Sequence, residues 1–114
     1  MIIRTEEMKR TVRPHMRGGA GEVVVTNLMD AQQMAHTRLF STLTLETGCS
    51  IGEHDHVNET EYYWILAGEG IVTEKDGDHR VRVGDLVVTG GGASHAIRNE
   101  REETLILLAL IILD

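Results

Sequence analysis

Short hydrophobic runs separated by glycine make up most of the chain from residue 39 onward. In the first run the side chains alternate as in a strand, where successive residues point to opposite faces. One face carries Leu39, Ser41, Leu43 and Leu45, and the other carries Arg38, Phe40, Thr42 and Thr44. Later runs are aromatic or β-branched, as strands favour, at residues 61–67, 71–74, 80–83, 86–88 and 94–98. The pattern predicts an all-β sandwich or barrel.

Turn residues separate these runs, and little of the chain favours a helix. Asp76-Gly77-Asp78 predicts the tip of a hairpin, and Gly84-Asp85 predicts a further turn. The polar stretch from Thr5 to Arg13 favours a turn, and the stretch from Met29 to Ala35 is too short for a stable isolated helix. The sequence has no repeat or linker, so residues 1–114 are expected to form one domain.

The run from Leu105 to Leu113 is apolar at every position, which a strand with one wet face would not be. Both of its faces are therefore expected to be covered, and Val23-Val24-Val25 has the same character. Since so short a chain has little left to cover a second face, we expect these strands to pack against a second subunit in a homodimer. The run is too short to cross a bilayer as a helix.

Charge and cysteine content narrow the class of partner. The net charge is −7 at pH 7, which argues against nucleic acid and anionic membrane as partners. Cys49 is the only cysteine, so an internal disulfide is impossible. The N-terminus lacks the basic and apolar segments of a signal peptide. We therefore expect a cytoplasmic protein whose partner is a small molecule.

Histidines and a carboxylate provide the candidate chemistry. His54 and His56 are two residues apart, so on a strand they point to the same side. Glu61 follows shortly after, and His95 lies further along the chain. Imidazole nitrogen and carboxylate oxygen are ligands of divalent first-row metals. The pattern therefore indicates a metal site.

Two glycine-framed segments carry these residues. The first spans residues 48–68, from Gly48 through the histidine pair and Glu61 to Gly68; the second spans residues 84–99, from Gly84 through His95 to Asn99. In order and spacing they resemble the two signature motifs of the cupin superfamily, and in particular its small single-domain prokaryotic members. One departure is that Gly90 stands where the family usually has proline, which should loosen the turn before His95 without removing a ligand.

The resemblance implies a double-stranded β-helix, a jelly-roll barrel, with one divalent metal in its mouth. By position in the motifs, the ligands are His54, His56, Glu61 and His95. Such a set suits Mn, Fe, Co, Ni, Cu or Zn, among which the sequence does not distinguish. If the ion is six-coordinate, two positions stay open for water, a chelating substrate or dioxygen.

Further residues are candidates for contact with a substrate. Glu59 competes with Glu61 as ligand; the spacing to Gly68 favours Glu61, and the other is expected to be a surface charge, a group behind the ligands or a proton shuttle. Tyr63 shares strand parity with Glu61, so it is either a wall residue or a group that orients substrate. Ser41 and Leu107 are expected to line the pocket. Arg17, in the segment Arg13–Gly19, either reaches over the mouth to bind a carboxylate or belongs to a solvated loop.

The fold does not determine the chemistry. The leading hypothesis is a metal-dependent enzyme acting on a small oxygenated organic acid, with decarboxylase-like or dioxygenase-like chemistry. Tyr63 and Glu59 are its candidate catalytic residues. The alternative is a non-catalytic module that binds or senses a small ligand or a metal. A metal-independent sugar-nucleotide epimerase is disfavoured, since it would not need the full ligand set.

Overall fold

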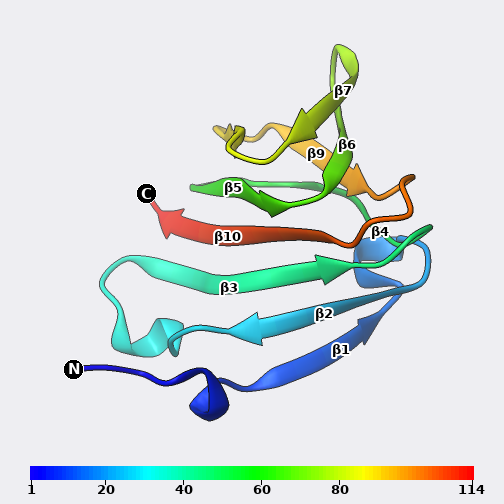
Figure 1. Cartoon of the computed structure of the whole chain (residues 1–114). Coiled ribbons are helices and arrows are strands. Elements are labelled where there is room, and N and C mark those ends of the chain that lie inside the picture. The colour runs from blue at the N-terminus through cyan, green and yellow to red at the C-terminus, as the bar shows by residue number, and fades with distance from the viewer.

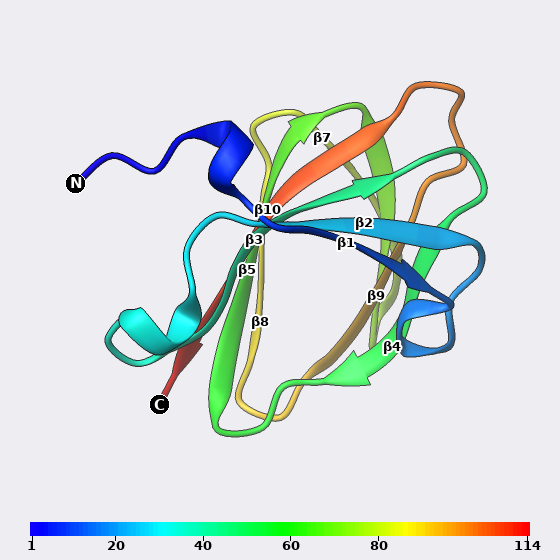
Figure 2. The same cartoon turned by 90° about the horizontal axis from the view of Figure 1, so that it is seen from below.

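Ten strands form two antiparallel sheets in the computed structural model, which describes residues 1–114 (Figure 1). The larger sheet has the spatial order β1 (Arg10–Pro14), β2 (Glu22–Asn27), β3 (Thr37–Leu45), β10 (Leu105–Leu113), β5 (Glu59–Ala67) and β8 (Leu86–Gly90). The smaller sheet has the order β4 (Ser50–Asp55), β9 (Ser94–Arg98), β6 (Glu69–Glu74) and β7 (Gly77–Arg82). Viewed from below, the strands surround a common interior (Figure 2). The expected all-β jelly roll is confirmed.

Strand β10 lies in the middle of the larger sheet, where it pairs with β3 on one side and β5 on the other. Its alternate residues from Leu105 to Ile111 are at most 3% exposed and face the interior. The residues between them, from Ile106 to Ile112, face outward and are half-buried. Its uninterrupted apolar sequence thus serves two faces of one sheet, the inner of which lies in the core.

The interior changes from apolar to polar along the strands. On β5, inward positions run from Ile65 and Tyr63 to Glu61 and Glu59. The same change occurs on two further strands, from Val87 to Thr89 on β8 and from Ile97 to His95 on β9. Burying the apolar side chains stabilises the fold by about 1.5–3 kcal/mol each. The polar ones lie together at the other end of the barrel, and buried polar groups need partners there.

The N-terminal third differs from the sequence-based expectation. Residues 10–13, expected as part of a turn, belong to strand β1, which is exposed along its whole length and pairs with β2. The only helices are single 3-10 turns, namely η1 (Thr5–Glu7), η2 (Met16–Gly18) and η3 (Ala31–Gln33), and none of them could serve as a membrane span. Pairing with β2 decides the state of residues 10–14, and their own sequence shows no apolar alternation that would indicate it.

Candidate metal centre

A β-bulge in β4 sets the direction of the two neighbouring histidines. Ile51 pairs with Ile97 and His54 pairs with His95, so β4 holds one more residue than β9 over this stretch. The extra residue lets Ile51 point into the core and His54 point into the polar end, although they are three positions apart. Gly52 lies in the bulge against η2, where a Cβ atom would be 2.1 Å from the carbonyl oxygen of Arg17. The bulge therefore requires glycine.

His95 follows the turn at the end of β8. Gly90, in the position where the related motif usually has proline, lies against β5, and a Cβ atom there would be 2.4 Å from Thr60 Oγ1. A side chain at this position would displace Thr60. Glycine in place of proline at position 90 thus allows β8 to lie close to β5.

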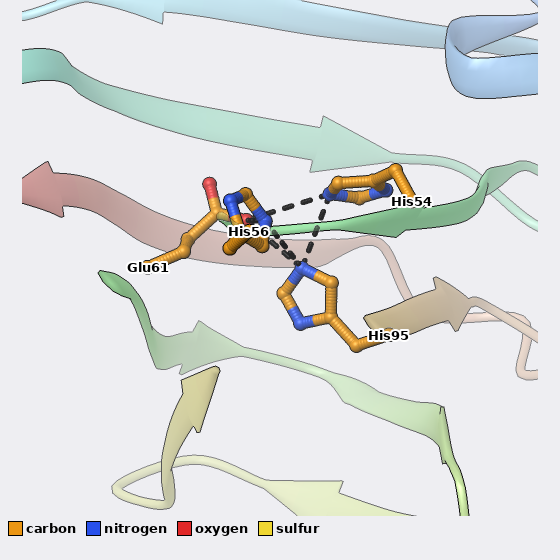
Figure 3. A group of neighbouring side chains, drawn as sticks. All are labelled: His54, His56, Glu61 and His95. Carbon is orange, nitrogen blue, oxygen red and sulfur yellow. Dashed lines mark hydrogen bonds and ion pairs between the residues drawn. The ribbon is translucent and has the colours of Figure 1, made fainter. Parts of the chain in front are cut away.

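Three imidazoles and one carboxylate converge at the polar end of the barrel (Figure 3). The Nε2 atom of His95 lies 3.1 Å from Nε2 of His56 and 3.1 Å from Nε2 of His54. Glu61 Oε1 lies 2.9 Å from Nε2 of both His56 and His95, and 3.6 Å from Nε2 of His54. Four potential ligand atoms, from β4, β5, β9 and the residue after β4, thus surround one point.

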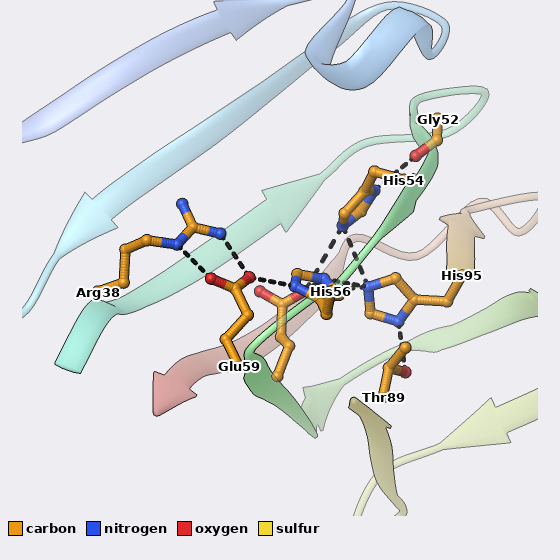
Figure 4. Close-up of polar contacts among 8 residues, drawn as sticks. Arg38, Gly52, His54, His56, Glu59, Thr89 and His95 are labelled. Carbon is orange, nitrogen blue, oxygen red and sulfur yellow. Dashed lines mark hydrogen bonds and ion pairs between the residues drawn. The ribbon is translucent and has the colours of Figure 1, made fainter. Parts of the chain in front are cut away.

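The other ring nitrogen of each histidine has its own partner (Figure 4). His54 Nδ1 donates to the carbonyl oxygen of Gly52 at 2.8 Å, and His56 Nδ1 donates to Glu59 Oε2 at 2.5 Å. His95 Nδ1 lies 2.8 Å from Thr89 Oγ1. A neutral imidazole that donates from Nδ1 keeps its lone pair on Nε2. These partners therefore orient the lone pairs toward the common point, as around a metal ion.

The charge state of the cluster also suits a cation. Burial alone would raise the pKa of Glu61, but hydrogen bonds from His54 and His95 and the nearby imidazole charges bring it down to about 2. Burial lowers the pKa of His95, with Glu61 opposing this effect. At neutral pH Glu61 is thus an ionised carboxylate beside an imidazole, that of His95, which burial keeps neutral; both are in the state that metal binding needs.

The donor set fits a divalent transition metal. Without a cation, the Nε2 atoms of His54, His56 and His95 and a carboxylate oxygen of Glu61 would face one another, and atoms with lone pairs are hydrogen-bond acceptors with few protons to share. Their spacing of 2.9 to 3.6 Å is that of neighbouring ligands around an ion with metal–ligand bonds of about 2.1 Å. The arrangement could therefore hold one such ion, and it leaves open which.

Glu59 lies behind the cluster, on the far side of His56 (Figure 4). It is 8% exposed, and Arg38 binds it through two bonds of 2.7 Å. The Arg38 guanidinium holds the pKa of Glu59 at about 2, against burial and with help from His56. Glu59 is therefore neither a fifth member of the cluster nor a surface charge.

The alternation of the sequence predicted Arg38 on the same face of β3 as Phe40, which is the outer face of the sheet. Ile111 pairs with Leu39 but Ile112 pairs with Thr37, so Arg38 is the extra residue of a bulge in β3. A bulge can re-aim a side chain, and here the guanidinium reaches Glu59. Nothing in the alternation of the sequence indicates such a bulge.

The remaining predicted site residues occupy different places. Tyr63 is 1% exposed, and its ring stacks on His95 with centroids 4.7 Å apart and planes at 12°. Burial and the Glu61 carboxylate raise the pKa of Tyr63 well above its usual value, and the charge of Arg17 opposes the rise. Arg17 is an exposed residue of η2 with φ of 54°. Ser41 and Leu107 are both fully buried on the inner face of the larger sheet.

Comparisons with known proteins agree with this fold. A family model for the cupin domain, Cupin_2, matches residues 41–111. The chain is 39% identical over 114 residues to the oxalate-binding protein of Thermotoga maritima, covering 99% of this chain and 94% of that one.

Solved structures give the same result. A predicted oxalate decarboxylase from Thermotoga maritima superposes with a TM-score of 0.95 at 38% identity, covering 100% of both chains. A putative sugar phosphate isomerase from Acidithiobacillus ferrooxidans superposes with a TM-score of 0.81 at 25% identity, covering 97% of this chain and 74% of that one. Together with the two motifs and the jelly-roll fold, these matches show that the chain belongs to the Cupin_2 family of cupin-domain proteins.

Proposed function

We propose that the chain binds one divalent transition metal ion through Nε2 of His54, His56 and His95 and a carboxylate oxygen of Glu61. The proposal rests on the short distances between these four atoms, since the contacts described above measure 2.9 to 3.6 Å. The fixed Nδ1 partner of each histidine supports it, because an imidazole held in one orientation loses less freedom on binding a metal.

We further propose that the site binds a small chelating dicarboxylic acid of the oxalate class. When bound, a metal ion of this kind supplies a Lewis acid for carboxylate oxygens. The matches from Thermotoga maritima, which cover nearly the whole chain, carry the names oxalate-binding protein and predicted oxalate decarboxylase. Arg17 lies on η2, which packs against the bulge of β4 before His54, so its charge is available near the cluster for an anionic ligand.

Binding without turnover is the function that the polar groups support best. A proton shuttle needs a pKa near the working pH. Glu59, with its pKa of about 2 and its ties to Arg38 and His56, does not meet this requirement. Tyr63 is protonated at neutral pH, as a phenol ordinarily is, and burial raises its pKa further, so its hydroxyl is available as a hydrogen-bond donor.

The second candidate is a metal-dependent decarboxylase or dioxygenase acting on the same kind of acid. It is favoured by the placement of Tyr63, whose ring lies on His95 and beside Glu61, where its hydroxyl could orient a reacting ligand by donating a hydrogen bond. Metal and ligand would bind to the same residues in both candidates, and product formation alone separates them.

Metal analysis and calorimetry test the proposal. We expect purified protein to contain close to one transition metal ion per chain, and His54→Ala to lose it together with oxalate binding. The matched control is His36→Asn, which replaces an exposed histidine that is not close to other potential metal ligands by a residue that tolerates its positive φ of 52°. Full metal content in His54→Ala would contradict the proposed site. Carbon dioxide release or oxygen uptake with oxalate would favour the enzyme over the binder.

We also propose that the outer face of the larger sheet forms a homodimer. The outward-facing positions of its four central and edge strands carry no charged side chain over the following ranges: Phe40 to Thr44 on β3, Ile106 to Ile112 on β10, Thr60 to Leu66 on β5, and Leu86 to Val88 on β8. Trp64 is 48% exposed there, and Val88 is 52% exposed. An apolar area of this kind usually marks an interface. Sedimentation should show a dimer that Trp64→Glu converts to monomer; a monomeric wild type at micromolar concentration would refute the proposal.

A further inference from the structure

A polar cavity of about 380 Å³ lies on the inner face of β1, β2 and β3. Lys9, Thr11 and Arg13 line it from β1 and the residue before it, and Asn27 and Ser41 line it from β2 and β3. The pairing of β1 with β2 explains this arrangement. Arg13 lies opposite Val23 and Thr11 lies opposite Val25, and both valines face inward, so Arg13 and Thr11 share the inner face with them. The volume is within the range of small-molecule sites.

Two cations in this cavity have no acidic partner. The ion pairs of the structure involve Arg38, Arg80, Arg98, Arg101 and several histidines, but neither Lys9 nor Arg13. The one carboxylate on the cavity wall, Asp30, accepts a bond from the backbone N–H of Gln32. In a chain with a net charge of −7, two cations that line one cavity without an acidic partner are unusual. They favour an anion.

The floor of the cavity supplies an independent observation. The Ser41 hydroxyl is the only buried side-chain polar atom in the structure that has no hydrogen-bond partner. Leaving such a group unpaired costs about 1–3 kcal/mol, so it normally has a role to explain it. Strand β1 is exposed along its length, so the long side chains of Lys9 and Arg13 can adjust when a ligand reaches the floor.

We propose that this cavity binds a small oxyanion, a carboxylate or phosphate group, between the Lys9 ammonium and the Arg13 guanidinium, with the Ser41 hydroxyl donating a third hydrogen bond. All three groups are donors, and the oxygens of such an anion are acceptors only. The site goes beyond the proposed metal-dependent function, because none of its three groups belongs to the metal cluster. Arg38 forms part of its wall and also holds Glu59, so the two sites are neighbours.

Calorimetric titration of the purified full chain with inorganic phosphate, and separately with acetate, tests the proposal and distinguishes the two anion classes. Saturable binding of at least one of them is expected, and Lys9→Ala with Arg13→Ala should weaken it by about tenfold or more. Ser41→Ala should weaken it by about threefold or more. The matched control is Arg10→Ala, which removes a cation from the outward face of the same strand and should change the affinity by less than about twofold.

His54→Ala separates this site from the metal centre, since it should lose metal and keep anion binding. Four results would overturn the proposal: no saturable binding up to about 20 mM of either anion, equal weakening by Arg10→Ala, loss of binding in His54→Ala, or unchanged binding in Ser41→Ala. Thermal melts of each variant, followed by circular dichroism, show that the weakened proteins remain folded. Failure of the metal proposal would appear as absent metal in wild type, which leaves the anion titration unaffected.

Discussion

Replacing Glu59 by glutamine tests how far the group behind the cluster controls metal binding. The substitution keeps the size of the side chain and removes its charge. An amide oxygen can still accept from His56 Nδ1, but the amide NH₂ would then face the Arg38 guanidinium, donor against donor. His56 would keep its place on the chain and lose the charged partner that fixes its orientation.

The magnitude follows from the two contacts of Glu59. Loss of a carboxylate behind a ligating histidine typically lowers metal affinity by about 10- to 100-fold, equivalent to about 1.4–2.8 kcal/mol. The side chain of Arg38 is 46% exposed, so solvent limits its ion pair with Glu59 to about 1 kcal/mol or less of folding stability. We therefore expect a large effect on metal affinity and a small one on the stability of metal-free protein.

Competition with a chromophoric chelator measures the metal dissociation constant, and urea unfolding measures the stability. Arg38→Lys, which keeps the charge but loses the two-bond geometry, should weaken metal binding less than Glu59→Gln does. Glu53→Gln is the matched control, since Glu53 is exposed on β4 beside the ligands and bonds to nothing. If Glu59→Gln binds metal within about twofold of wild type, the contact with His56 has no influence on the site.

Three further predictions concern the same end of the barrel. Gly52→Ala should lower the free energy of unfolding by about 2 kcal/mol or more in urea titration, because its Cβ atom would meet the Arg17 carbonyl oxygen. Metal-free protein should lose stability as the pH falls from 4.5 to 2, because Glu59 and Glu61 have folded-state pKa values of about 2, below their ordinary 4.5. Their contribution to the free energy of unfolding is complete above pH 4.5. A chain with glutamine at both positions should therefore show a flatter dependence of stability on pH. Tyr63→Phe should weaken oxalate binding by about threefold to tenfold in calorimetry while metal content stays unchanged, since only a hydrogen-bond donor is lost.

The sequence predicted the strands and the members of the cluster because both depend on local patterns. Period-two alternation indicates which residues of β3 and β5 share a face. The resemblance to the two cupin motifs implies that His54, His56, Glu61 and His95 form one set of ligands, and the structure brings these four together. The preference for Glu61 over Glu59 rested on the spacing of the first motif, and the structure places Glu61 among the three imidazoles.

The structure adds features that depend on pairing between distant segments. Arg38 reaches Glu59 only because β3 has one more residue than β10 at that point, and alternation cannot show where a bulge falls. Strand β1 has no apolar periodicity and forms because β2 offers an open edge. The cavity beside Lys9 and Arg13 depends in turn on that strand, so no stretch of sequence indicates it by itself.

The bulge in β4 also decides between two sets of ligands that the strand carries on its opposite faces. Glu53 and Asp55, now exposed, would turn inward if the strand were paired without the extra residue, and His54 would turn out. The barrel mouth would then present mainly oxygen donors, the kind preferred by hard ions such as Mg²⁺ and Ca²⁺, in place of a nitrogen-rich set suited to borderline metals. A Gly52→Ala chain that recovers by straightening β4 should reveal this exchange in metal competition as a gain in preference for Mg²⁺ or Ca²⁺. One glycine would then determine which class of ion the strand selects.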